Sequence, residues 1–258
     1  MKTIIFSDVH LNVAEDGRDL MRDLTAFLRN IDPAETERIV VLGDLFDFWF
    51  EYKHVIFSGY FDVLRAFADL SDSGVEIHFI IGNHDFWAGR FLVNHLRFQI
   101  HQELLLEMGG KRVLFVHGDG INPKDVGYRI YKRIARAPFV IWLFGIIHPD
   151  WAMGIAQGVA RGSRHLKKVE DLSKGTEVIP LQTFAKRTLA EGKADVVMCG
   201  HSHYPVMEEH PTPTGTGLYI NTGDWLFHKS YVEWDGEEYK QRLFVAEAGR
   251  EEVAQRDH

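Results

Sequence analysis

Side chains able to bind metal ions recur at five places in the sequence, each directly after a short apolar stretch. The first is Asp-Val-His at residues 8–10, which follows the strand-like residues 2–6. The full set is Asp8, His10, Asp44, Asn83, His117, His201 and His203. A single histidine at such a position is more often structural than a ligand, but five coordinated occurrences are not expected by chance. Nitrogen and oxygen ligands without thiolate favour manganese, iron or zinc over calcium.

The number of these side chains points to two metal ions. A tetrahedral zinc site uses about four ligands, whereas the present set suffices for two ions if one carboxylate is shared between them. Two ions about 3.5–4 Å apart stabilise the attacking and leaving oxygens of a phosphoryl displacement, and they lower the pKa of a bound water. The residue types therefore predict a dinuclear centre that cleaves phosphate esters.

The elements that must position these residues alternate along the chain. Strands are expected at 2–6, 38–44, 76–85, 111–119, 194–203, 218–225, 231–236 and 239–246, the last three antiparallel, and amphipathic helices at 19–31 and 60–70. In open α/β sheets, functional groups gather beyond the carboxyl ends of strands. Residues i and i+2 of a strand point to the same face, so Asp8 and His10 should face a common point.

The alternation lapses between Ile121 and Gln182, where apolar and basic patches take its place. We interpret residues 121–182 as a helical cap inserted in a single domain, residues 1–258, and residues 247–258 as a charged tail. The longest apolar run of the cap covers residues 138–147, whereas a helix that spans a membrane needs about 20 residues.

The net charge of −8 argues against nucleic-acid binding through a broad basic face. The charge is uneven, because residues 128–169 contain eight basic side chains and one acid, a net +7 that leaves −15 for the remainder. The single cysteine, Cys199, excludes an internal disulfide and fits a reducing compartment. No signal peptide is recognisable at the amino terminus, so we expect a cytoplasmic protein. The negative net charge leads us to expect no nucleic-acid partner.

The motifs D-x-H, G-D-x-x-D, G-N-H-D, H-G-D and G-H-S-H, in this order, resemble those of the calcineurin-like metallophosphoesterases. The resemblance implies an α/β fold of two mixed sheets packed together and flanked by helices (αββα), to which the cap is added. It implies two divalent ions, with manganese expected and iron or zinc as alternatives. In this assignment the first ion takes Asp8, His10 and His203, the second takes Asn83, His117 and His201, and Asp44 bridges them.

Two further residues receive catalytic roles from the same resemblance. His84 of G-N-H-D should lie over the phosphate, neutralise developing charge and protonate the leaving group. Asp47, three residues after Asp44, resembles the carboxylate that orients this histidine; the alternative is an exposed loop acid. Asp119 and Asp224 are left outside the catalytic set.

The cap resembles that of the UDP-2,3-diacylglucosamine pyrophosphatases of lipid A synthesis, because H-G-D is followed by D-x-G-Y-R at residues 125–129, an apolar insert and a serine in a basic helix. The resemblance implies that metal-activated hydroxide cleaves UDP-2,3-diacylglucosamine to UMP and 2,3-diacylglucosamine 1-phosphate. The implied substrate-binding residues are Asp125, Tyr128, Arg129, Arg133, Ser163 and Lys167. The best-known of those enzymes carry arginine at the position of His84, so a broad phosphodiesterase or phosphatase acting on a soluble substrate stays as the alternative.

The residues of the cap agree with a nucleotide-diphosphate lipid as substrate. Arg129, Lys132, Arg133 and Arg136 follow helical spacing and form one basic face. The run at 138–147 is apolar on all sides, which suits acyl chains or, with the cations, an anionic membrane surface. We therefore expect a protein peripheral to the inner membrane. The alternative is that residues 138–147 form a buried helix of the cap.

Overall fold

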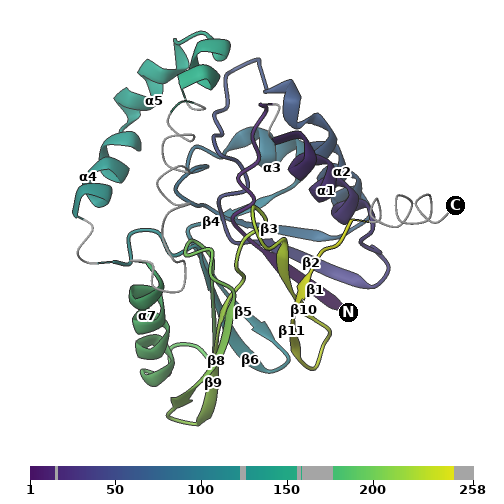
Figure 1. Cartoon of the computed structure of the whole chain (residues 1–258), viewed down its shortest axis with the longest axis vertical. Coiled ribbons are helices and arrows are strands. Elements are labelled where there is room, and N and C mark those ends of the chain that lie inside the picture. The colour runs from purple at the N-terminus through teal and green to yellow at the C-terminus, as the bar shows by residue number, and fades with distance from the viewer. Residues whose placement is uncertain (15–16, 123–125, 156–157, 159–176, 247–258) are drawn as a thin grey trace, which may run out of the picture.

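Two β-sheets lie face to face in the computed structural model, which describes residues 1–14, 17–122, 126–155, 158 and 177–246 (Figure 1). The first sheet has six strands in the order β11-β10-β1-β2-β3-β4. Its strands are β1 (Lys2–Phe6), β2 (Thr36–Val41), β3 (Glu76–Ile80), β4 (Gln99–His101), β10 (Ser230–Trp234) and β11 (Tyr239–Leu243). β1 to β4 run parallel, whereas β10 is antiparallel to both of its neighbours.

The second sheet has five strands in the order β5-β6-β7-β9-β8. Its strands are β5 (Glu103–Met108), β6 (Lys111–Val116), β7 (Val196–Cys199), β8 (Val206–Thr212) and β9 (Gly215–Asn221). The three central strands run parallel, and β5 and β8 pair antiparallel at the edges. Both sheets are therefore mixed, as predicted.

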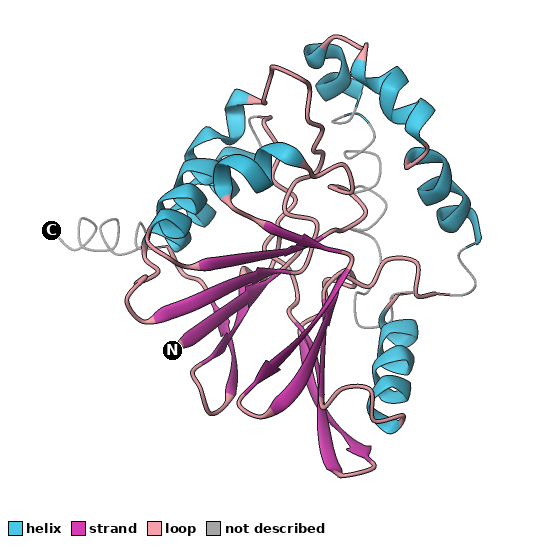
Figure 2. Cartoon of the chain, turned by 180° about the vertical axis from the view of Figure 1, so that it is seen from behind, coloured by secondary structure: helices cyan, strands magenta, loops and turns pink. Residues whose placement is uncertain are grey.

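Alternation along each strand divides its side chains between the space between the sheets and the helices outside. In β1, Ile5 packs against residues of the second sheet, whereas Ile4 and Phe6 pack under helices. The six-stranded sheet is covered by α1 (Arg18–Arg29), α2 (Phe61–Asp72), which the short η2 (Ser58–Tyr60) precedes, and α3 (Arg90–Leu96). The five-stranded sheet is covered by α7 (Val178–Ala190) (Figure 2). The predicted arrangement of two packed sheets flanked by helices is confirmed.

Both predicted core helices are present as α1 and α2, and α1 buries Leu20, Leu24, Phe27 and Leu28 along one face. The predicted antiparallel pairing of the last three strands holds for β10 and β11 and for β9 with β8, but β9 also runs parallel to β7. α3, β4, β5 and β8 were not expected. β4 has only three residues and β8 contains two glutamates and a proline, so neither carries a clear apolar pattern.

Two helices within the predicted cap, α4 (Val126–Ala135) and α5 (Pro138–Gly145), follow one another outside the two sheets, on the same side of the molecule as α7 (Figure 1). α7 begins before residue 182, the predicted end of the cap, and packs on the five-stranded sheet. The tail at 247–258 lies outside the described residues. Within the described residues no single helix could cross a membrane; one pair, α5 with Pro149–Ile155, passes by length and composition but is bent by 118°.

A pair of histidines in the six-stranded sheet should make the stability of the protein depend on pH. His78 Nδ1 lies 3.2 Å from His101 Nε2, and His78 Nε2 lies 3.4 Å from a Glu76 oxygen. Burial lowers the pKa of both histidines, whereas the unfolded chain accepts protons near the ordinary pKa of about 6.5. The free energy of unfolding should therefore fall as the pH drops from about 6.5 toward the lowered values of the folded state.

Melting temperatures at about pH 8 and about pH 5.5 test this prediction with the double variant His78→Gln/His101→Gln. The wild type should lose more stability between the two pH values than the double variant does. His54→Gln, which removes an exposed imidazole, should keep the wild-type loss. An equal loss in the wild type and the double variant would contradict the prediction.

Candidate metal centre

The predicted ligands lie in loops directly after the strands, and five of them have an unusual backbone conformation. Positive φ angles, between 52° and 66°, occur at Asp8, His10, Asp44, His201 and His203. Among the described non-glycine residues, only Arg97 and Lys229 share this feature. A left-handed residue of this kind costs about 1–3 kcal/mol and persists where the surroundings hold it, often at functional sites.

Asp8 and His10 meet for a different reason from the one predicted. β1 ends at Phe6, so the expectation that strand alternation aims the two side chains is wrong. Their left-handed backbone turns them instead. The amide of Asp8 donates to the Gly43 carbonyl at 3.1 Å and that of His10 to the Asp44 carbonyl at 2.9 Å, which ties this loop to the loop after β2.

Glycines in two of the motifs make room for carboxylates from other loops. A β-carbon at Gly82 would collide with the side chain of Asp44, and one at Gly200 would collide with that of Asp8. The motifs G-N-H-D and G-H-S-H therefore require glycine at their first position, because each glycine lies directly against a predicted ligand and leaves no room for a side chain.

The first cluster consists of Asp8, His10 and His203, whose ligand atoms all lie within 4.8 Å of one another. Asp8 Oδ1 is 3.8 Å from His10 Nε2 and 3.6 Å from His203 Nε2. All three residues are buried, and the two imidazole rings stack with centroids 5.1 Å apart. These are the residues predicted for the first ion.

The second cluster consists of Asp44, His117 and His201. His117 Nε2 lies 3.4 Å from Asp44 Oδ2 and 3.2 Å from Asn83 Oδ1. The same Asp44 oxygen is 3.9 Å from His10 Nε2 in the first cluster. One carboxylate oxygen thus faces both clusters, as a bridging ligand requires, and all of the predicted ligands come together at one place.

Oxygen atoms behind the clusters orient two of the imidazoles. His117 Nδ1 lies 2.6 Å from the carbonyl oxygen of Leu42, and His203 Nδ1 lies 3.2 Å from Asp224 Oδ2. When Nδ1 carries the proton and donates to these oxygens, Nε2 is left as the unprotonated atom that can bind a metal ion.

The centre contains buried polar atoms that a cation would satisfy. Within the described residues, Asp8 Oδ1 and His10 Nε2 are buried without a hydrogen-bond partner. An unpaired buried polar atom costs about 1–3 kcal/mol. A divalent ion bound by oxygen and nitrogen would pair with both atoms, so the residues fit a metal centre.

The charges of the centre agree with this fit. Burial lowers the pKa of His10, which keeps the ring neutral and able to bind a metal. Burial also acts to lower the pKa of His117, but the negative charges of Asp44 and Asp8 outweigh it and raise the pKa to about 10. The buried carboxylates therefore attract positive charge to the place where the second ion is expected.

Residues 1–205 match the model of the calcineurin-like phosphoesterase family. The chain belongs to this family. It is similar to a UDP-2,3-diacylglucosamine hydrolase of Porphyromonas gingivalis, with 32% identity over 91% of this chain and 94% of the relative. A hydrolase of the same name from Aeromonas salmonicida is 30% identical over 88% of this chain and 87% of the relative. Among solved structures, an archaeal phosphodiesterase aligns with 94% of this chain and 99% of its own at 16% identity and a TM-score of 0.49.

As a member of the calcineurin-like phosphoesterases, the protein is a metal-dependent hydrolase. The family and the two clusters together support divalent metal ions as its cofactors. The predicted family and fold are thereby confirmed.

His84 and Asp47 lie beside the first cluster of this phosphoesterase. His84 Nδ1 is 3.0 Å from the main-chain carbonyl of Asp47, and its ring centroid is 4.7 Å from that of His10. The Asp47 carboxylate lies 3.3 Å from His10 Nδ1 and is buried. Asp47 was predicted to orient His84 through its carboxylate. In the structure the main-chain carbonyl of Asp47 contacts His84, while the carboxylate contacts His10, a predicted metal ligand.

Asp224 contributes to the centre although its role was not predicted. It is fully buried, and its second oxygen, Oδ1, accepts hydrogen bonds from the amides of Phe227 at 2.8 Å and His228 at 2.9 Å. These bonds fix the carboxylate against His203. A signal was present in the sequence, because glycine and aspartate follow a strand here just as they do at Asp44.

Asp85 links the loops that carry two predicted ligands. One of its oxygens accepts the amide of Gly82 at 2.9 Å and the other accepts the amide of Leu45 at 2.8 Å. The fully buried carboxylate therefore ties the loop of Asn83 to the loop of Asp44.

Replacing Asp224 by asparagine should weaken the binding of one metal ion about 10–100-fold and leave the other unchanged. Asparagine removes the negative charge behind His203. Its side-chain NH₂ group, a donor, must then face either the His203 ring or the main-chain N–H groups that donate to Asp224 in the wild type. Calorimetric titration of the metal-free protein with Mn²⁺ measures both affinities. Asp195→Asn, which alters a carboxylate paired with Arg112 far from the clusters, serves as the control. Wild-type affinity at both sites would contradict the prediction.

The structure describes only part of the predicted substrate-binding set. Asp125, Ser163 and Lys167 lie outside the described residues. Arg129 and Arg133 are exposed on α4, and the hydroxyl of Tyr128 donates to Asp119 at 2.6 Å. Contact of these side chains with a substrate stays a prediction.

Proposed function

We propose that the protein hydrolyses UDP-2,3-diacylglucosamine to UMP and 2,3-diacylglucosamine 1-phosphate. The two relatives described above bear the name of this substrate. The observation in this chain that carries the proposal is an apolar surface on α4 and α5, beside a centre suited to phosphate esters. An enzyme for a lipid-linked diphosphate needs both features.

α4 and α5 expose the side chains that a surface helix ordinarily buries. On α4 the apolar residues are 52–56% exposed, namely Val126, Ile130, Tyr131 and Ile134. α5 has no buried residue, and Phe139 and Trp142 are 68% and 61% exposed. The alternative of a buried helix at 138–147 is therefore wrong for the residues in α5. Large exposed apolar patches are rare on monomeric proteins and mark binding surfaces for lipid or protein.

The proposed cofactor is a pair of divalent ions, with manganese as the first choice and iron or zinc as alternatives. The first cluster would hold one ion, and the second cluster with Asn83 would hold the other, with Asp44 shared between them. When bound, the ions supply activation of water and neutralisation of charge on the phosphate. The absence of thiolate and the mixture of oxygen and nitrogen ligands support this choice.

His84 is the proposed acid of the reaction. Its Nδ1 is held by the Asp47 carbonyl at 3.0 Å, which leaves Nε2 as the atom that can contact a substrate. From that position the ring would donate a hydrogen bond to a phosphate oxygen and pass a proton to the leaving phosphate.

Product analysis with three substrates tests the proposal. Purified protein with Mn²⁺ is given UDP-2,3-diacylglucosamine, UDP-N-acetylglucosamine or bis(4-nitrophenyl) phosphate. Rapid release of UMP from the acylated substrate alone is the expected result, because the apolar surface has a ligand only there. Turnover of the aryl diester alone would contradict the lipid assignment and favour a broad phosphodiesterase.

We also infer that the exposed face of α5 binds an anionic membrane surface, which would place the protein in the cytoplasm, peripheral to the inner membrane. The double variant Phe139→Ser/Trp142→Ser should bind vesicles of phosphatidylglycerol and phosphatidylethanolamine at least about tenfold more weakly, since burial of one such side chain contributes about 1.5–3 kcal/mol. Phe61→Ser removes a 61% exposed aromatic from α2 and should have no effect. Equal vesicle binding by the wild type and the double variant would exclude this role of α5.

A further inference from the structure

We propose that Asp119 locks the cap onto the metal centre by holding Tyr128 and Lys132 of α4, so that these three residues position the cap for its substrate. The consequence for catalysis rests on the proposed lipid-linked substrate, whereas the lock itself does not.

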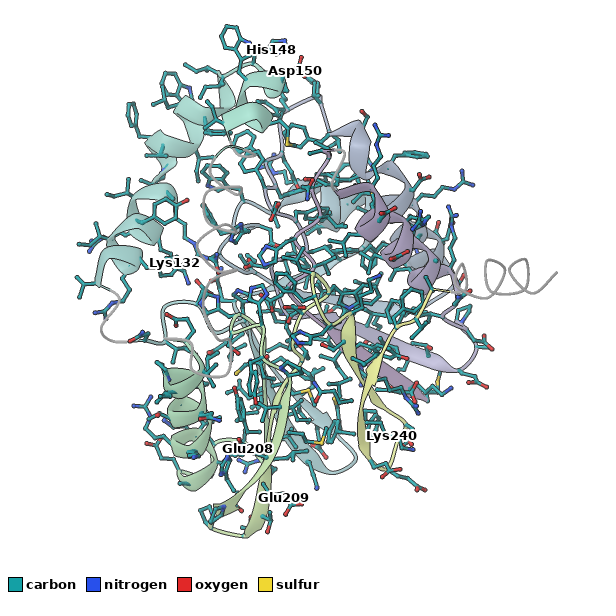
Figure 3. All side chains as sticks on the ribbon, viewed as in Figure 1. Lys132, His148, Asp150, Glu208, Glu209 and Lys240 are labelled. Carbon is teal, nitrogen blue, oxygen red and sulfur yellow. The ribbon has the colours of Figure 1, made fainter. Side chains whose placement is uncertain are left out.

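Asp119 lies in the loop after β6, two residues beyond the predicted ligand His117. Its side chain is only 6% exposed. Oδ2 accepts a hydrogen bond from the Tyr128 hydroxyl at 2.6 Å and forms an ion pair with Lys132 Nζ. The two donors are four residues apart on α4 and so lie on one side of the helix. Figure 3 shows Lys132 on the side of α4 that faces the rest of the molecule. One carboxylate therefore joins two turns of the helix to the loop of a metal ligand.

Apolar packing does little to hold this part of the cap. Ala135 is the single buried residue of α4, and α5 has none. Trp87 Nε1 donates to the Ala135 carbonyl at 3.1 Å, and Phe144 packs on the rings of Phe48, Phe50 and Trp87. These contacts fix the end of α4 and one residue of α5. The contact with Asp119 instead holds the middle of α4 and the side of the helix that faces the core.

The lock accounts for the inverted orientation of α4. The hydrophobic effect favours turning Ile130 and Ile134, both 56% exposed, toward the core. That rotation would separate both Lys132 and the Tyr128 hydroxyl from the Asp119 carboxylate, and the loss of these partners from a buried carboxylate is unfavourable. The apolar side of α4 is therefore held outward, where an acyl chain or a membrane can reach it.

Hydrogen exchange of α4 tests the lock without any substrate. Asp119→Asn and Lys132→Met should each speed exchange of the amides at 126–135 at least about tenfold, while α1 stays unchanged. The double variant should exchange no faster than the faster single variant, because both changes remove the same interaction. Lys193→Met, which removes a lysine paired with Glu191, should leave α4 unchanged. Wild-type exchange in Lys132→Met, or additive effects in the double variant, would overturn the proposal.

Kinetics with two substrates test the consequence for catalysis. With UDP-2,3-diacylglucosamine, Lys132→Met should raise KM at least about tenfold. The loss of kcat/KM that this variant shows on bis(4-nitrophenyl) phosphate should be at least about tenfold smaller than its loss on UDP-2,3-diacylglucosamine. Equal losses on both substrates would place Lys132 at the reacting phosphate and overturn the positioning role. If the wild-type protein failed to hydrolyse the lipid substrate, the proposed function would fail, and the exchange experiment would still decide the lock.

Discussion

Replacing Asp44 by asparagine should lower kcat/KM at least about 10³-fold, which corresponds to about 4 kcal/mol of transition-state stabilisation. Bound metal should fall from two ions toward one per chain. Asp44 Oδ2 lies 3.4 Å from His117 Nε2 and 3.9 Å from His10 Nε2, so the charge on one oxygen serves both clusters. Asparagine keeps the size of the side chain but removes that charge, and each ion loses a ligand or an attractive neighbour.

The loop around Asp44 should keep its fold in this variant. Asp44 Oδ1 accepts the amide of His84 at 2.9 Å, and the amide oxygen of asparagine can accept the same bond. Metal content measured by mass spectrometry, together with kcat/KM, separates loss of an ion from loss of the fold. Asp195→Asn, at the surface pair with Arg112, is the matched control. Two bound ions with activity within about tenfold of the wild type would rule out a bridging role.

The sequence could predict which side chains meet, because each predicted ligand directly follows an apolar strand and parallel strands end at the same edge. It could not predict how they are turned. Asp8, His10 and Asp44 adopt left-handed backbone angles that short polar residues tolerate only when other loops hold them. Those loops come from distant parts of the chain, as with the bond from the His10 amide to the Asp44 carbonyl.

Supporting contacts over long sequence distances were the part that could not be predicted. The amide of Trp225 donates to the carbonyl of Asp8 at 3.1 Å, which brings the loop of Asp224 beneath the first cluster. No local pattern shows this pairing, because it depends on β10 lying next to β1 in the sheet. The contact of the Asp47 carbonyl with His84 could not be predicted either, because every residue has a main-chain carbonyl.

The cap shows the limit of helical periodicity as a guide. Spacing predicts one basic side for α4, but it does not say which side of the helix faces the core. The ordinary expectation places cations in water, whereas Lys132 pairs with the buried side chain of Asp119. An acidic partner on the core decided the orientation, and that partner lies outside the helix.

Replacing His84 by glutamine should lower kcat about 10²–10³-fold while both metal ions stay bound. The hydrogen bond from the main-chain N–H of His84 to Asp44 does not involve the His84 side chain, so the substitution leaves it in place. Glutamine cannot carry a proton to the leaving phosphate, and it offers no positive charge. His84→Arg should recover only the part of kcat that depends on positive charge, because the guanidinium keeps a cation and its Nε–H can donate to the Asp47 carbonyl in place of Nδ1. It should not recover proton transfer, because arginine does not release a proton.

Metal content decides between two roles for His84. Its ring lies close enough to His10 and Asp44 to complete a third group of possible ligands. If His84→Gln lost an ion, the residue would be a ligand and not the acid of the reaction. His95→Gln, which removes an exposed imidazole from α3, controls for general effects on metal uptake. Retention of two ions with a large fall in kcat in His84→Gln would place the role of His84 at the phosphate. Full recovery in the arginine variant would assign that role to charge neutralisation alone and would contradict proton transfer, because arginine does not release a proton.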